Sequence, residues 1–331
     1  MKILVDISGA DKGISTPIKA ALKSVNKIES KIVLVGRMDD IKSVITKKDD
    51  LEKLEILECE DYITNQDEPV NAIKNKKKSN LVVAFNYMKE NEDTVLISSS
   101  NTGALMAGAL LKLGRIAGIH RPALVTLLPT VKDNKKVLLL DSGANPEAKE
   151  LSLIQYAKLG ELYSKYLLNV ENPRISLLNI GREEEKGTQD LKDTYVKLKE
   201  IYKEDFDGNI ESRYILKGFS DVIVCNGIMG NVALKTLEGT AKTLKNVIKE
   251  SYMKNLYTKF IGFLSKPILN KTLKRYDYKY HEGAVLLGVK KPVIKIHGSS
   301  NSTTYCIAIN QANNILKSKL IEKIEKEIKK D

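Results

Sequence analysis

The stretch "TVLISSSNTGAL", residues 94–105, joins a short apolar run to six small polar residues and then to an Ala- and Leu-rich segment. An apolar run that stops at serine and glycine is typical of a buried strand followed by a tight loop. The composition of the segment after the loop favours a helix. A strand, a polar loop and a helix in this order form the repeating unit of an α/β fold.

The same pattern recurs along the chain, and the segments between the apolar runs are amphipathic. The other apolar runs are "KILVDI" (2–7), "KIVLVG" (31–36), "PALVTLLP" (122–129), "KVLLLDSG" (136–143), "RISLLNIG" (174–181), "DVIVCNG" (221–227) and "PVIKIHG" (292–298). Short runs of this kind predict the strands of a sheet that helices cover on both faces, an α/β layered fold. Apolar residues four apart between 303 and 330 predict one long C-terminal helix.

The composition is that of a globular enzyme. The 331 residues, 42% of them hydrophobic, can bury one large core, and no repeat, linker or low-complexity tract divides them. We therefore expect a single domain over residues 1–331 with interleaved subdomains. Three widely spaced cysteines favour a reducing compartment, and no apolar stretch has the length of a signal peptide or a spanning helix, so we expect a cytoplasmic protein. The net charge of +12 suits an anionic partner.

Polar, glycine-containing loops follow most of the predicted strands. They are "DISGAD" (6–11), "SSSNTGAL" (98–105), "DSGAN" (141–145), "NIGREEEKG" (179–187), "CNGIMGN" (225–231) and "HGSSNS" (297–302). Glycine lets backbone N–H groups approach a ligand, and a following helix directs its positive end to the same place, a combination that favours an oxyanion. Ligands in such sheets bind beyond the carboxyl ends of strands, so we expect the loops to converge. Each loop alone is equally consistent with ordinary helix capping.

Other chemical signatures are missing from the sequence. In "GREEEKGT" (181–188) the lysine precedes the glycine, so the segment is no Walker A loop, and neither G-x-G-x-x-G nor G-x-S-x-G occurs. The three histidines are isolated, so we expect no metal site and no cofactor. His297 has the best claim to function because it follows a strand and precedes Gly298-Ser299-Ser300.

Several longer strings occur in a fixed order, among them "SNTGALMAG", "DSGAN", "GNIESR", "DVIVCNGIMGNVALKTLEGTA" and "EGAVLLGVKKPVIKIHGSSNS". In this order they resemble the PlsX-type phosphate acyltransferases of bacterial phospholipid synthesis, over nearly the whole chain. The resemblance implies transfer of a fatty acyl group from acyl carrier protein to inorganic phosphate, giving acyl phosphate. It also implies a three-layer α/β/α sandwich on a mixed, largely parallel sheet, similar to the isocitrate dehydrogenase and phosphotransacetylase group, and a homodimer at the membrane surface.

Phosphate is already a workable nucleophile, so such an enzyme mainly aims it and stabilises the thioester oxygen as it becomes negative. The resemblance and the loop chemistry together predict the following site residues. The predicted catalytic residues are Asn101, Lys186, Asn231 and Asp6, and the predicted phosphate contacts are Ser98, Thr102, Gly103 and Lys235. The predicted supporting residues are Asp141, Asn145, Asn226, His297 and Ser299. Without the resemblance, Lys235 reads as a surface lysine and the two aspartates as loop caps.

The chain departs from the family pattern near the predicted site. Relatives usually read D-A-M-G-G-D-H-A-P where this chain has "DISGADKGI" (6–14), so Lys12 replaces a histidine. Asn226 stands where the family's C-D-G-F has a carboxylate. Because phosphate needs no strong general base, we expect activity to be retained.

The segment at about 252–278 has a separate character. Leu256, Phe260, Phe263 and Leu264 share a helical face, Pro267 interrupts it, and Ile268 and Leu269 resume it between lysines. An apolar face flanked by positive charge is typical of an anchor on an anionic membrane surface. A hairpin packed in the core or in a dimer is the alternative.

Two other functions remain open. A phosphotransacetylase-like enzyme that uses acyl-coenzyme A would share the fold and the loops. A nucleic-acid-binding protein would explain the positive charge, but the lysines are dispersed and no binding motif is visible, so we expect no nucleic-acid partner.

Overall fold

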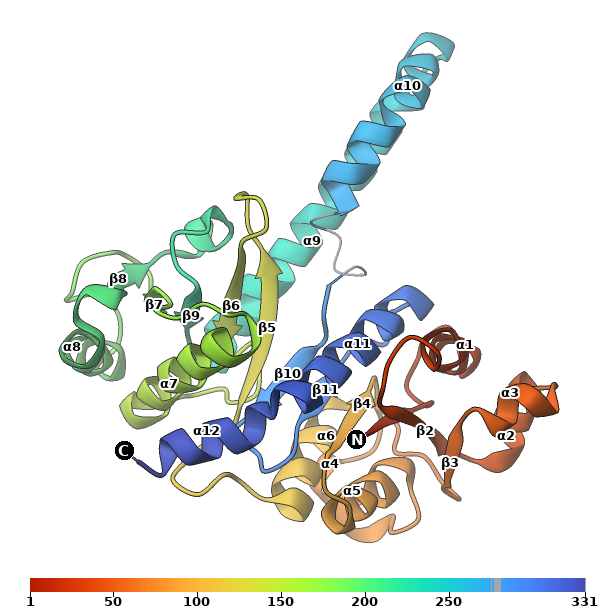
Figure 1. Cartoon of the computed structure of the whole chain (residues 1–331). Coiled ribbons are helices and arrows are strands. Elements are labelled where there is room, and N and C mark those ends of the chain that lie inside the picture. The colour runs from red at the N-terminus through yellow and green to blue at the C-terminus, as the bar shows by residue number, and fades with distance from the viewer. Residues whose placement is uncertain (275, 277–280, 331) are drawn as a thin grey trace.

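The computed structural model describes residues 1–274, 276 and 281–330, and their strands form one eleven-stranded sheet (Figure 1). The strand order is β3-β2-β1-β4-β11-β10-β5-β6-β9-β7-β8. The strands are β1 (Lys2–Asp6), β2 (Lys31–Gly36), β3 (Glu55–Glu58), β4 (Thr94–Ser98), β5 (Ala123–Pro129), β6 (Lys136–Leu140), β7 (Ile175–Leu178), β8 (Phe206–Ile210), β9 (Val222–Val224), β10 (Ala284–Leu287) and β11 (Val293–Lys295).

The sheet contains two parallel blocks that run in opposite directions. Strands β3, β2, β1, β4 and β11 are parallel, and β6, β9, β7 and β8 are parallel. Between the blocks, β10 is antiparallel to both β11 and β5, and β5 is antiparallel to β6. The prediction of a mixed, largely parallel sheet is confirmed.

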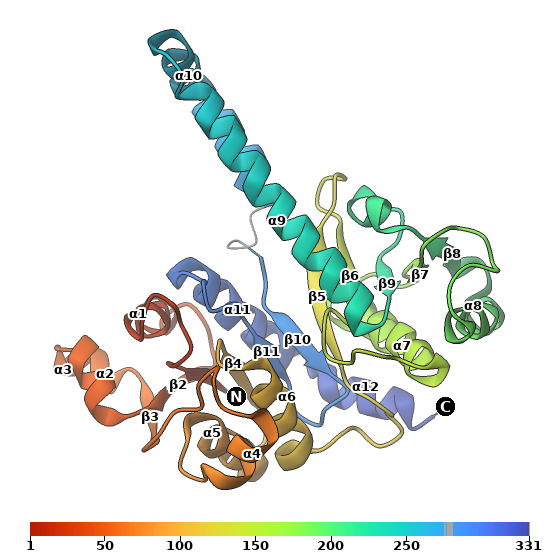
Figure 2. The same cartoon turned by 180° about the vertical axis from the view of Figure 1, so that it is seen from behind.

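Helices cover both faces of the sheet (Figures 1 and 2). The face that packs Ile3, Val5, Leu138 and Leu140 is covered by α1 (Ser15–Ser24), α2 (Met38–Val44), α7 (Glu150–Leu167), α8 (Gln189–Tyr202), α11 (Ser302–Ser318) and α12 (Leu320–Ile328). The opposite face packs α4 (Pro69–Asn75), α5 (Asn80–Glu90) and α6 (Thr102–Gly108), which continues as the π-helix η1 (Ala109–Leu113), and also the 3₁₀ helix η3 (Ser212–Lys217) and α9 (Gly227–Tyr252). The remaining helices are α3 (Lys48–Glu52), η2 (Lys203–Asp205) and α10 (Leu256–Lys274).

The period-two alternation of the strands produces this three-layer arrangement. In β1, Ile3 and Val5 belong to one core while Leu4 between them belongs to the other, and Leu96 of β4 shares the core of Leu4. Side chains of successive strand residues point to opposite faces, so a continuous apolar run needs helices on both.

All eight strands predicted from the apolar runs are confirmed, whereas β3, β8 and β10 were not predicted. "FDGNI" in β8 contains two polar residues and a glycine, so its apolar signal is weak. The prediction of one C-terminal helix is wrong. The chain turns at Lys319, whose φ of 52° is left-handed, and this ends α11 and starts α12.

The long α9 and the antiparallel α10 form a hairpin that projects from the body in both views (Figures 1 and 2). The prediction that Pro267 interrupts α10 is wrong, because the helix continues through it. Proline removes one backbone hydrogen bond, and the carbonyl that it frees lies on an exposed helix where water can bind it. The end of the predicted segment, at residues 275, 277 and 278, lies outside the described residues.

The apolar side chains of the hairpin lie in solvent. The exposed fractions are 83% for Leu256, 62% for Phe260, 72% for Phe263, 60% for Leu264 and 72% for Ile268, and Leu269 is half-buried. Gly262 permits close packing of the two helices, because a Cβ there would lie 2.9 Å from Tyr252 Cβ. None of the described helices is both long and apolar enough to span a membrane.

Candidate active site

The six polar loops form two sets, because the two blocks of the sheet run in opposite directions. The loops after β1, β4 and β11 lie at one end, which we call the Asp6 end. The loops after β6, β9 and β7 lie at the carboxyl end of the second block, which we call the Asp141 end. The two sets nonetheless approach each other. Through the ladders, Leu140 at the end of β6 is aligned with Val125, Val285 and then Ile294 near the end of β11, so the carboxyl ends of the two blocks lie at neighbouring levels of the sheet. The convergence of all six loops stays a prediction.

The Asp6 carboxylate organises the Asp6 end. Asp6 is buried at the end of β1, and its Oδ atoms accept hydrogen bonds from Ser98 Oγ at 2.7 Å and Ser100 Oγ at 2.6 Å. They also accept from the backbone N–H and hydroxyl of Ser8 and, at 3.0 Å, from Nδ2 of Asn80. One carboxylate thus fixes the loop of Ser98, Ser99 and Ser100 after β4, which we call the serine loop, relative to β1 and α5.

Close backbone contacts hold the three loops of the Asp6 end together. A Cβ on Gly9, whose φ is +74°, would lie 2.6 Å from the backbone nitrogen of Ser100. A Cβ on Gly298 would lie 2.6 Å from a carboxylate oxygen of Asp11, and the Asp11 amide donates to the Gly298 carbonyl at 2.9 Å. The glycines are needed because larger residues would separate the loops.

Strands β4 and β11 are neighbours, yet the helices that follow them lie on opposite faces of the sheet. Ala104 and Leu105 of α6 pack in one core, and Tyr305 and Ala308 of α11 pack in the other. In open α/β sheets, neighbouring strands that send their helices to opposite faces leave a crevice beyond their carboxyl ends, where ligands bind. The Asp6 end therefore has the topology of a ligand site.

The serine loop itself is largely occupied by internal contacts. The Ser98 hydroxyl is buried and gives its single proton to Asp6, so in this structure it supports the loop and has no donor left for phosphate. Asn101 caps α6, because its Oδ1 accepts from the Ala104 amide at 3.1 Å, while its Nδ2 faces the carbonyls of Thr64 and Asp67 at 3.4 and 3.5 Å. The amides of Thr102 and Gly103 open the helix, where N–H groups have no intrahelical partner.

Helix α9 connects the Asp141 end to the Asp6 end. It starts at Gly227, and three turns later Glu238 lies near His297 of the loop after β11. Burial raises the pKa of the Glu238 carboxyl, while His297 and Lys235 lower it. His297 is exposed, and its Nδ1 lies 2.8 Å from the Ser299 hydroxyl. Lys235, His297 and Ser299 thus belong to the Asp6 end.

Asp141 and Asn145 organise the loop after β6. The Asp141 carboxylate accepts from the amides of Ala144 at 2.7 Å and Asn145 at 2.9 Å, and burial raises its pKa. Asn145 Nδ2 reaches Asp141, the Pro122 carbonyl and the Tyr156 hydroxyl, all within 2.9 Å.

The start of α9 packs directly on this loop. Asn226 caps the helix by accepting from the Met229 amide at 2.9 Å, a bond that an aspartate would also make. The family departure at Asn226 thus preserves the helix start. Gly143 packs on Asn231, since a Cβ on the glycine would lie 3.5 Å from the Asn231 side chain.

Lys186 lies on an exposed loop after β7. Its carbonyl accepts from Asn179 Nδ2 at 3.0 Å, and the same asparagine donates to Oδ1 of Asn209 in β8. Strand β9 separates β7 from β6, so Lys186 lies at the Asp141 end, two strands from β6. Of the four predicted catalytic residues, Asp6 and Asn101 follow strands of the first block and Lys186 follows a strand of the second. Asn231 lies on α9, one turn before Lys235, and the assembly of all four in one site stays a prediction.

Three polar residues of the Asp6 end were not predicted. Asn80 and the hydroxyl of Tyr305, which lies 2.8 Å from Ser99 Oγ, are buried in it. Lys295, at the end of β11, donates from Nζ to the Ser99 carbonyl at 2.8 Å. The available signal for Lys295 was a lysine inside the apolar run "PVIKIHG" (292–298), where a solvated lysine is out of place.

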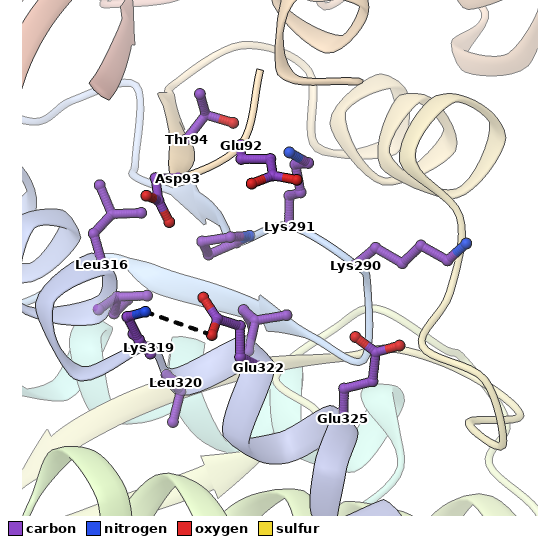
Figure 3. A pocket seen from close by; sticks show the side chains of 13 residues that line it. Glu92, Asp93, Thr94, Lys290, Lys291, Leu316, Lys319, Leu320, Glu322 and Glu325 are labelled. Carbon is purple, nitrogen blue, oxygen red and sulfur yellow. Dashed lines mark ion pairs between the residues drawn. The ribbon is translucent and has the colours of Figure 1, made fainter. Parts of the chain in front are cut away.

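A cavity of about 260 Å³ lies at the amino ends of β4 and β11, away from the polar loops (Figure 3). Charged side chains of both signs line it, including Glu92, Asp93, Lys291 and the ion pair between Lys319 and Glu322 at 3.9 Å. It contains none of the predicted site residues. No cluster of metal-binding side chains occurs among residues 1–274, 276 and 281–330.

Known protein sequences match this chain over nearly its whole length. A sequence model of one family, described as "Fatty acid synthesis protein", matches residues 1–323. The phosphate acyltransferase of Thermoanaerobacterium thermosaccharolyticum is 41% identical, covering 99% of this chain and 97% of that protein. The phosphate acyltransferase of Bacillus cereus strain B4264 is 40% identical, covering 100% and 99%.

Solved structures of lower sequence similarity share the fold. A phosphotransacetylase from Streptococcus pyogenes has a TM-score of 0.61 at 16% identity, covering 96% of this chain and 94% of that one. The EutD phosphotransacetylase from Staphylococcus aureus has a TM-score of 0.58 at 14% identity, with the same coverage. The α/β architecture is therefore that of the phosphotransacetylases.

Proposed function

The chain belongs to the phosphate acyltransferase family, and from this premise we propose that it transfers a fatty acyl group from an acyl carrier protein thioester to inorganic phosphate. The product would be acyl phosphate for phospholipid synthesis. The observation that carries the proposal is the match to curated phosphate acyltransferases at about 40% identity over essentially the full length of both chains.

The proposed reaction is an acyl substitution. A phosphate oxygen attacks the thioester carbonyl, the new C–O bond forms, the C–S bond breaks, and the sulfur leaves as the thiol of the carrier after taking up a proton. The protein has to hold phosphate close to the carbonyl and to stabilise the oxyanion that develops there. Both tasks need N–H donors and a positive potential more than a strong base.

We place phosphate at the Asp6 end, in the crevice between the loops after β4 and β11. The donors proposed are the amides of Thr102 and Gly103 and the side chains of Lys235 and Ser299. This choice is supported by the switch of helices between the two faces of the sheet and by the positive end of α6. Asp6, Ser98 and Asn101 then act by holding the loop, and Asn231 and Lys186 are left as candidate contacts for another part of the substrate.

Acyl-coenzyme A is the alternative acyl donor, because the solved structures of similar fold are phosphotransacetylases. The two donors differ in what surrounds the thioester, since one is carried by a protein and the other by a nucleotide. Parallel assays with both thioesters at equal concentration separate the two functions.

The test is to incubate the protein with acyl carrier protein thioester and phosphate and to trap acyl phosphate with hydroxylamine. We expect acyl hydroxamate that depends on both phosphate and protein, and much less with acyl-coenzyme A. A reaction without added phosphate is the control for direct attack of hydroxylamine on the thioester. Equal hydroxamate with and without phosphate would refute the proposed reaction, and a preference for coenzyme A would favour the alternative.

We further propose that the protein acts as a homodimer on the inner face of the cell membrane, in the cytoplasm. The exposed apolar face of α10 supports this location, because water is a poor environment for Phe260 and Phe263. Acyl phosphate with a long chain is itself poorly soluble, so release at the membrane would deliver it to the next, membrane-bound acyltransferase.

A further inference from the structure

Lys295 occupies an unusual position for a lysine. It ends β11 between Ile294 and Ile296, and in the parallel ladder it pairs with Ser98 of β4. Its Nζ donates to the carbonyl of Ser99 at 2.8 Å and to that of Ile296 at 2.9 Å. Lys295 is half-buried, and an aliphatic residue would be the ordinary choice in this strand, because a lysine is rarely taken out of water unless its charge is hydrogen-bonded.

The bond to Ser99 fixes one peptide group of the serine loop. The carbonyl of the Ser99–Ser100 peptide accepts from Lys295, and the amide of the same peptide donates to Ser98 Oγ at 3.0 Å. Both the C=O and the N–H group of this peptide are therefore hydrogen-bonded. It lies immediately before Asn101 and the first amides of α6, so its orientation sets the direction in which those amides point.

Lys295 also supplies positive charge close to the Asp6 carboxylate. Asp6 accepts hydrogen bonds from neutral groups: serine hydroxyls, a backbone amide and the Asn80 side chain. Burial lowers the pKa of Lys295 to about 8, and the charges of Asp6 and Asp11 act in the opposite direction. A phosphate anion that enters this site meets the field of a carboxylate, and a nearby ammonium group offsets that repulsion.

We propose that Lys295 is a positioning residue for the phosphate acyltransferase reaction. Its ammonium group holds the Ser99 carbonyl in place and offsets the negative charge of Asp6, so that the serine loop binds a phosphate anion. The inference rests on the function proposed above. Lys295 acts through the loop and through its charge, with both of its Nζ hydrogen bonds directed at backbone carbonyls.

The consequence for pH follows from the direction of the shift. Lys295 is charged at neutral pH and loses its proton as the pH rises through about 8, so the rate should fall on the basic side over that range. The titratable groups that face it are Asp6 on β1, Asp11 in the next loop and Tyr305 on α11, which bonds to the same serine. Burial raises the pKa of Tyr305, so the phenol stays neutral there.

The test compares two variants. Lys295→Met keeps a side chain of similar length but removes the charge, and Lys295→Arg keeps a positive charge throughout the pH range of the assay. The matched control is Lys291→Met. Lys291 precedes the same strand, and its Nζ also bonds to a backbone carbonyl, that of Asn91 at 2.6 Å, but far from the serine loop. The readouts are phosphate-dependent acyl hydroxamate formation between pH 6 and pH 9.5, roughly the range in which such a group titrates, and amide hydrogen exchange of residues 98–103.

We expect Lys295→Met to lower kcat/KM for phosphate by about tenfold or more at pH 7, mainly by raising KM. Its pH profile should lack the basic limb, which is the fall in rate as the pH rises through about 8. Lys295→Arg should recover part of the rate and keep it above pH 8, and Lys291→Met should behave as the wild type. Exchange in residues 98–103 should be faster in Lys295→Met alone. A Lys295→Met variant that keeps both the wild-type rate and its basic limb would overturn the inference.

The two proposals fail separately. A wild-type protein that makes no phosphate-dependent product would refute the proposed function. In that case the exchange measurement alone decides on Lys295: faster exchange of residues 98–103 in Lys295→Met supports the holding role, and exchange equal to that of Lys291→Met overturns it.

Discussion

At the scale of single residues, the Asp6 end depends on one buried carboxylate with several neutral donors. Replacing Asp6 with asparagine puts an NH₂ group against the hydroxyls of Ser98 and Ser100 and the amide of Asn80, which already point their protons at this position. We expect Asp6→Asn to lower the free energy of unfolding by about 2 kcal/mol or more. The chain has no tryptophan, so urea unfolding is best followed by circular dichroism.

The control for this prediction is Asp39→Asn at the exposed start of α2, which should change the free energy of unfolding by less than about 0.5 kcal/mol. If the two variants unfold at the same urea concentration, Asp6 does not hold the loops together.

The residue scale also shows which site features a sequence can predict. Asn101, Asn226 and Asn301 were singled out or lay in the quoted loops, and each one caps a helix. The preference of asparagine for such positions is local, so it is readable from the chain. Lys295 was missed because its role depends on a neighbouring strand that is distant in sequence, and the general rule for lysine places it in solvent.

At the scale of elements, two of the three glycines of α9 have opposite roles. A Cβ on Gly230 would lie 2.2 Å from the carbonyl oxygen of Asp141 and 2.7 Å from Cys225 Sγ, whereas a Cβ on Gly239 would meet nothing within 4 Å. Gly230→Ala should therefore destabilise the protein by about 2–3 kcal/mol, because a backbone carbonyl cannot easily move. Gly239→Ala should stabilise it by about 0.5–1 kcal/mol, since alanine favours the helix.

Thermal unfolding of the two variants measures both effects, and each serves as the other's control in the same helix. Equal shifts of the midpoint would mean that the start of α9 does not pack on the loop after β6 as described.

The α9–α10 hairpin carries the second prediction at this scale. Phe260 and Phe263 are 62% and 72% exposed, and burying two such side chains in a lipid interface contributes about 3 kcal/mol in total. The double variant Phe260→Asp, Phe263→Asp should then lower binding to anionic liposomes by about a hundredfold in a flotation assay.

The matched control is Val196→Asp, Ile201→Asp on α8, whose side chains are 53% and 54% exposed and which adds the same two charges elsewhere. Unchanged flotation together with a loss of self-association, measured by light scattering, would assign the apolar face to a second copy of the chain.

At the scale of the whole molecule, the sequence predicted the layers but not the directions of the strands. Strong apolar runs identified eight strands and the amphipathic segments between them required helices on both faces. The reversal between the two blocks is produced by β10 and β5, each paired antiparallel with its neighbours. Pairing of this kind is a long-range property, and β10 follows the projecting hairpin, so no local pattern shows where it inserts. The consequence is that the polar loops leave two blocks of strands that run in opposite directions.

The overall charge gives the last prediction. A net charge of +12 spread over the surface creates a positive potential that speeds the encounter with an acidic protein and that salt screens. If the acyl donor is a negatively charged carrier protein, as proposed, raising the salt from about 0.05 M to about 0.3 M should lower kcat/KM for the carrier thioester by roughly tenfold. The rate with a neutral acyl-pantetheine donor should change by less than about twofold, because its encounter is not steered. A loss of equal size with both donors would instead locate the salt effect in phosphate binding, and no loss with either would exclude electrostatic steering by this surface.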